Sequence, residues 1–243
     1  MARKPTKRNP QHSPGGTAAT APNSPAGSNR EKIIAAFMAL LAEQRIEDIG
    51  FADIAARAGV SLADLREEFG SKLAILAAHI KDIDRKVLSG GDADMTEEPP
   101  RERLFDVLMR RLETLAPHRA AVRSLLRSAR RHPGFALALN GLAVKSQQWM
   151  LTAANINAAG PKGVVRAQGV ALLFARVLRT FVDDDDPGLA RTMAALDRAL
   201  ARGQRWSSFL DDLCCLAPGR RCLSPFRRRR DADLDRREEP MPI

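Results

Sequence analysis

The chain has 243 residues, 44% of them hydrophobic, and a formal net charge of +10 at pH 7. Three cysteines near the C-terminal end exclude a disulfide framework and indicate a reducing compartment. The start of the chain lacks the apolar segment of a secretory signal, so we expect a cytoplasmic protein. Because tyrosine is absent and Ala, Leu, Val and Ile dominate the apolar residues, the composition favours an all-α fold.

The excess positive charge lies mainly at the two ends of the chain. Residues 1–29 contain four basic and no acidic residues, and their Pro- and Gly-rich composition predicts a disordered basic arm. Residues 214–243 contain eight arginines and five acidic residues, which predicts a basic disordered tail. This charge suggests a polyanionic partner.

Two Ser-x-x-acid sequences predict the starts of helices in the first third of the chain. Ser28 with Glu31 precedes a stretch in which apolar residues recur at helical spacing. Ser61 with Asp64 precedes a second, shorter amphipathic stretch. Both pairs have the spacing of a capping box, in which each partner satisfies a backbone N–H of the other.

Helices are predicted over 51–58, 61–69 and 72–88. Gly59 separates the first two and is free to adopt the left-handed conformation that ends a helix. Together with the helix that follows Ser28, they make a predicted N-terminal domain over 30–88.

The sequence SGGDADMTEEPP, at 89–100, concentrates Gly, Asp and Pro and marks the predicted domain boundary. A larger helical domain is predicted over 100–213. Pro133 and Pro187 suit the first turns of their helices, and Asp186 suits an N-cap. The predicted helices are 101–115, 119–131, 133–156, 162–182 and 187–204.

The motifs IAARAGVS and L-x-x-x-F-G-S-K resemble the helix-turn-helix of the TetR family of bacterial transcriptional regulators. The resemblance implies an all-α, TetR-like architecture, with an N-terminal DNA-binding domain and a larger helical ligand-binding and dimerisation domain. It also implies a homodimer formed by 162–182 and 187–204, and a helix at 61–69 that lies in the major groove. The implied DNA-binding residues are Gly50, Ser61, Leu62, Ala63, Arg66, Glu67 and Lys72.

The charge of the predicted DNA-binding unit departs from this family. Residues 30–72 contain six basic and eight acidic residues, a net charge of −2. Arg66 stands where the family often has a phosphate-contacting Tyr, and Gly50 where it often has Thr. Affinity for duplex DNA comes largely from cations that displace counterions. Three interpretations therefore stay open: the arm at 1–29 supplies the missing charge, Arg66 and Glu67 read a guanine and a cytosine, or the unit survives for packing alone.

A second resemblance covers residues 100–213. The sequences ERLFDVLMRRLETLAPHRAAVRSLL, LARTMAALDRAL and W-x-x-F-L-D-D-L resemble the TetR-fold lipid-binding protein of coenzyme Q (ubiquinone) biosynthesis. It implies an alternative function, an accessory protein that has lost DNA binding and presents an isoprenoid lipid to a partner enzyme. Residues 206–230 combine apolar residues with an arginine run, which suits adsorption to an anionic membrane or a solubilising tail.

Residues 133–161 contain a single charge, Lys145, and are expected to form a helix that is apolar on most sides. Both resemblances imply a ligand cavity here, and a plain helical core with a dimer face is the alternative. An apolar small molecule or lipid is favoured, because each buried methylene contributes about 0.8 kcal/mol. The predicted ligand-binding residues are Leu142, Trp149, Met150, Phe174 and Leu178.

Arginines recur at a spacing of four at Arg119, Arg123 and Arg127, where a solvated face is expected. Four aspartates at 183–186 are expected to form a capping loop, since they lack the spacing of a calcium loop. His79 is expected to be packed or on the surface. No zinc spacing, nucleophile elbow, phosphate loop or dinucleotide fingerprint occurs, so we expect no catalytic residue, metal, cofactor or enzymatic activity.

Overall fold

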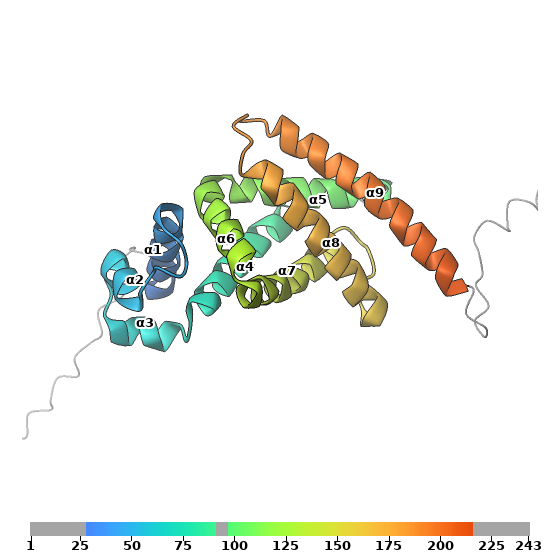
Figure 1. The fold of residues 1–243 in the computed structure, drawn as a ribbon. Coiled ribbons are helices and arrows are strands. Elements are labelled where there is room, and N and C mark those ends of the chain that lie inside the picture. Colours follow the sequence, from blue (N-terminus) through green and yellow to red (C-terminus); the bar gives the residue numbers. More distant parts are fainter. Residues whose placement is uncertain (1–27, 91–96, 216–243) are drawn as a thin grey trace, which may run out of the picture.

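The computed structural model describes residues 28–90 and 97–215, with side chains as far as Gly203. Every regular element in these ranges is a helix, which confirms the predicted all-α fold. Residues 28–71 form a small helical head at one end of the molecule, and residues 97–215 form a larger helical body (Figure 1). Within the described ranges, no helix combines the length and apolar character needed to cross a bilayer.

The head comprises α1 (Asn29–Glu43), α2 (Phe51–Ala58) and α3 (Leu62–Glu68). Both predicted capping boxes are confirmed. Ser28 and Ser61 accept the backbone N–H groups of Glu31 and Asp64, whose side chains accept the N–H groups of the two serines. Gly59 ends α2 with φ 65°, the left-handed conformation that was predicted for it.

The next helix, α4 (Lys72–Ser89), belongs to both parts of the molecule. Ile75 and Leu76 lie in the head core, whereas Ile83 and Val87 lie in the body core. α4 therefore connects the two cores as one continuous helix (Figure 1).

The body comprises α5 (Pro100–Leu115), η2 (Ala116–His118), α6 (Arg119–Arg131), α7 (Pro133–Ala153), α8 (Gly160–Phe181) and α9 (Ala190–Cys215). The predicted bounds of α6 are confirmed at both ends. α7 ends before the predicted residue 156, because Asn155 adopts a left-handed conformation with φ 53°. α9 continues well beyond the predicted end at 204, since apolar residues recur at helical spacing after Gly203.

The aspartates at 183–186 form a capping loop, as predicted, but Pro187 lies outside the helix that follows. The Asp186 carboxylate accepts the N–H of Ala190 (3.0 Å), and the Asp184 carboxylate accepts the N–H (2.8 Å) and hydroxyl (2.6 Å) of Thr192. α9 therefore starts three residues later than predicted, where these carboxylates satisfy its first free N–H groups. In the described part of the chain, no group of three or more His, Cys, Asp or Glu side chains has a metal-binding arrangement.

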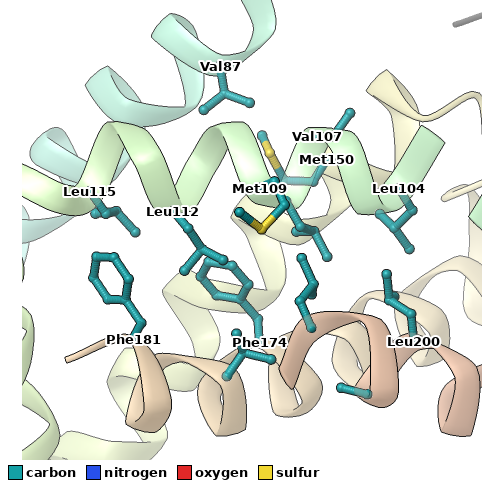
Figure 2. Close-up of a cluster of buried hydrophobic side chains, with 14 of the residues drawn as sticks. Val87, Leu104, Val107, Met109, Leu112, Leu115, Met150, Phe174, Phe181 and Leu200 are labelled. Atoms are coloured by element: carbon teal, nitrogen blue, oxygen red, sulfur yellow. The ribbon is translucent and has the colours of Figure 1, made fainter. Parts of the chain in front are cut away.

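The body core is formed where α8 faces α5 (Figure 2). Phe174 and Phe181 of α8 point toward Leu112 and Leu115 of α5, and all four side chains are buried. Each such side chain contributes about 1.5–3 kcal/mol when it is fully buried, and buried residues of α4, α7 and α9 complete the same core.

α6 carries the contact between body and head. Its residues Ala121 and Leu125 complete the head core. Beside them, the Ser128 hydroxyl donates to the Glu47 carboxylate (2.9 Å), which also lies 3.1 Å from Nε2 of His132. Apolar and polar contacts thus hold the head against α6.

The first arginines of α6 cap α8 instead of forming the expected solvated face. Arg119 donates to the carbonyl of Asp184, and its guanidinium lies 5.2 Å from the Phe181 ring centroid. Arg123 donates to the carbonyl of Val182. These carbonyl groups follow the last turn of α8 and have no helical partner, so the arginines stabilise that helix end.

Candidate nucleic-acid interface and body interior

One face of α3 is the candidate DNA-reading surface. Leu65 and Phe69 are buried in the head core and hold the helix in place. Four predicted DNA-binding residues lie on the exposed side: Leu62, Ala63, Arg66 and Glu67. Leu62 is 55% exposed, so its apolar side chain is accessible for contact with a partner.

Ser61 and Gly50 stand at the starts of α3 and α2. The Ser61 hydroxyl donates to the Asp64 carboxylate (2.7 Å), and this hydrogen bond lowers the pKa of Asp64. The Gly50 N–H donates to the Asp53 carboxylate (2.8 Å). A β-carbon at position 50 would lie 3.0 Å from that carboxylate oxygen, so Asp53 occupies the space into which a larger residue at position 50 would extend.

Lys72, which was also predicted to contact DNA, makes its hydrogen bonds with the head. Its ammonium donates to the carbonyl groups of Ile46 (2.6 Å) and Ile49 (2.9 Å), in the turn between α1 and α2. The side chain is partly buried there and ties the start of α4 to that turn. The guanidinium of Arg30 is similarly engaged, 5.7 Å from the ring centroid of Phe69.

Most carboxylates of the head also serve the fold. Glu43 accepts two hydrogen bonds from Arg57 (2.9 and 2.7 Å), which lower its pKa. Glu47 binds α6, as described above. Three more are helix caps: Glu31, Asp53 and Asp64. Within the described ranges, the acidic side chains of the head without a hydrogen bond or ion pair are Asp48, Glu67 and Glu68. Most of the acidic residues of the head are therefore explained by helix capping and ion pairing, and few of them lie unpaired on the exposed face of α3.

The structure brings three of the predicted ligand-binding residues together. Met150 and Phe174 are buried in the body core, and Leu178 packs against it. Leu142 is half-buried. Trp149 is 60% exposed and lines an open cavity on the outside of the body. It is separated from Met150 because neighbouring side chains on a helix point about 100° apart.

A buried polar cluster in the body was not predicted. Arg111 of α5 donates to Asp84 of α4 (2.6 Å) and to Ser146 of α7, and its guanidinium lies 5.4 Å from the Phe174 ring centroid. Burial lowers the pKa of Arg111, and the neighbouring carboxylate opposes this effect. The sequence does indicate that Arg111 faces the core. It stands three residues after the apolar Leu108, and residues at this spacing lie on the same face of a helix.

His79 of α4 is packed, one of the two expected outcomes. Its ring meets that of His118 edge to face, with centroids 4.6 Å apart. Burial, and secondarily the nearby His118, lower the pKa of His79 to about 4. The ring lies on α4 between the residues that enter the head core and those that enter the body core.

A three-helix head, a connecting helix and a larger helical body define a TetR-like fold. The TetR transcriptional regulator from Nitrosomonas europaea shares it with a TM-score of 0.58 and 22% sequence identity, over 74% of this chain and 99% of that one. A TetR transcriptional regulator from Rhodococcus sp. RHA1 shares it with a TM-score of 0.52 and 22% identity, over 72% of this chain and 95% of that one.

No protein-family model and no curated protein sequence matches the chain. The predicted TetR-like architecture is confirmed by the solved structures. The resemblance of the C-terminal half to the coenzyme Q biosynthesis protein stays a prediction.

Proposed function

We propose that the chain is a TetR-type transcriptional regulator that binds an operator with α3 in the major groove. The observation that carries the proposal is the exposed face of α3. Arg66, Leu62 and Ala63 are all exposed on it. The fold shared with two solved TetR regulators supports it.

The chemistry of this face suggests how bases are read. Arg66 donates to guanine O6 and N7, Glu67 accepts from the cytosine amine, and Leu62 and Ala63 contact the methyl group of thymine. Each good polar contact is worth about 1–3 kcal/mol of discrimination between bases.

The basic arm at 1–29 supplies the affinity that the head lacks. Residues 1–27, which hold all four cations of the arm, lie outside the described residues, and these cations neutralise about four phosphates if the arm binds along DNA. Its removal is therefore expected to weaken binding to every sequence and to reduce the salt slope by roughly four units.

A gel-shift titration with the DNA upstream of the chain's own gene tests both parts. We expect a sequence-specific complex that Arg66→Ala weakens by about 1–3 kcal/mol, with relaxed preference at one base pair. Arg85→Ala, which removes an equal charge from α4, is the matched control and leaves binding unchanged. A full-length protein that binds no duplex even at low salt contradicts the proposal.

The proposed regulator is a homodimer with an apolar effector. Val164, Val165 and Leu172 of α8 and Met193 of α9 are exposed apolar side chains that suit a dimer contact between these helices. We place the effector beside Met150, Phe174 and Leu178, where it favours one spacing of the two heads over another.

Mass spectrometry of co-purifying lipids, combined with liposome flotation before and after truncation at residue 205, tests the lipid-binding alternative. An isoprenoid lipid and membrane binding without any operator complex would favour an accessory protein of coenzyme Q biosynthesis. An effector that instead releases the operator complex supports the regulator.

A further inference from the structure

An open cavity lies on the surface of the body, between the end of α7 and the start of α8. Its volume is about 680 Å³, within the range of about 300–1,000 Å³ that is usual for small-molecule sites. Its lining residues are Gln148, Trp149, Thr152, Asn155, Ile156, Asn157, Ala158 and Ala159. None of them is charged, although 28% of the residues of the chain are.

The loop that forms one wall of the cavity is held in a defined conformation. Gly163 lets α8 approach the loop so closely that a β-carbon would overlap the Ala158 carbonyl. Arg103 donates to the carbonyl of Ala154 (2.8 Å), and Arg166 donates to the carbonyl of Asn157 (3.1 Å). These contacts come from α5 and α8 and hold the loop in this conformation.

The polar groups of the lining are available to a ligand. The Asn157 side-chain oxygen accepts the N–H of Ala159 (2.8 Å), which leaves its NH₂ group unused. Within the described residues, the side-chain amides of Gln148 and Asn155 make no hydrogen bond, although their backbone groups do. The lining thus offers amide donors and acceptors next to the broad apolar face of Trp149.

We propose that this cavity binds a neutral, hydroxylated ring compound whose apolar face stacks on Trp149. The lining offers no charged partner to an ion, so it favours a neutral ligand. Tryptophan offers a large, flat apolar surface for a ring, and the amides offer both donors and acceptors to hydroxyl groups. Free sugars and nucleosides share this chemistry. The inference does not depend on DNA binding.

The fluorescence of Trp149 tests the proposal directly. Trp206 is the only other tryptophan in the sequence, so full-length protein with Trp206→Phe reports on Trp149 alone. We expect a saturable change in emission with a neutral monosaccharide, disaccharide or nucleoside, and a much weaker one with its phosphorylated analogue. Titrating a panel of sugars and a separate panel of nucleosides shows which of the two classes binds.

Two variants separate binding at the cavity from binding elsewhere. Asn155→Gly removes one amide but tolerates the positive φ of this position, and it is expected to weaken binding about five- to tenfold. Lys145→Ala, on α7 outside the cavity, is the matched control and is expected to bind as the parent does.

Three results would overturn the proposal. They are an absence of saturable change across both panels, equal binding by the Asn155→Gly variant, and acrylamide quenching of Trp149 that falls as protein concentration rises. The last result would show that a second copy of the chain covers the cavity.

Discussion

At the scale of single residues, several charged side chains of the head and of the first turn of α4 complete backbone hydrogen bonds of the head. Lys72 donates to two carbonyl groups of the turn between α1 and α2, and Asp53 and Asp64 accept N–H groups at two helix starts. Their partners lie inside the head, so these charges contribute to stability before they contribute to any contact with DNA.

The Lys72→Met variant should lower the free energy of unfolding by about 1–3 kcal/mol, because two partly buried carbonyl groups lose their donor. Urea denaturation measures this loss. Lys81→Met, an exposed site on the same helix, is the control and should change little. If Lys72→Met instead keeps its stability and reduces the salt slope of DNA binding by about one unit, the lysine is a phosphate contact.

His79 predicts a pH dependence of stability. Its pKa is about 4 in the folded chain and about 6.5 when unfolded, so the unfolded chain gains the proton first as pH falls. The free energy of unfolding should therefore drop by up to about 2 kcal/mol between pH 7 and pH 5.

Denaturation at both pH values, in the parent and in His79→Leu, measures the contribution of this histidine. The variant should lose most of the drop, since it has no imidazole to protonate. An equal drop in both proteins would assign the effect to other groups, such as His118, whose pKa burial also lowers.

At the scale of elements, the junction of α7 and α8 depends on one close approach. Gly163→Ala places a methyl group against the Ala158 carbonyl and should cost about 1–3 kcal/mol of stability through overpacking. Gly169→Ala, on the same helix with open space around it, should stabilise the chain by about 0.5–1 kcal/mol. Thermal unfolding of the two variants checks this contrast, and equal melting temperatures would contradict it.

Local sequence predicts the helices better than it predicts their ends. The serines that cap α1 and α3 are recognisable because their partners stand three residues away. The end of α7 was predicted three residues too late, although Asn155, a residue type that readily adopts the left-handed conformation, ends the helix there. The exposed face of α3 follows from amphipathic spacing, whereas the role of Lys72 depends on carbonyl groups more than twenty residues away.

At the scale of the whole molecule, the pair of Asp84 and Arg111 links α4 to the body through a buried salt bridge of 2.6 Å. Asp84→Ala leaves Arg111 buried without its partner and should lower the free energy of unfolding by about 3–5 kcal/mol. The double variant Asp84→Leu with Arg111→Met should recover most of this loss, because apolar residues of similar size fill the same space.

Chemical denaturation of the single and double variants measures this difference. A double variant that is no more stable than Asp84→Ala would mean that Ser146 and the Phe174 ring depend on the guanidinium itself.

The sharing of α4 and α6 between two cores has a thermodynamic consequence. Cutting the chain after Gly90 would remove Ala121 and Leu125 from the head and leave its apolar interior open to water. Head and body should therefore melt in one cooperative transition, and their slowest amide protons should exchange through the same global opening.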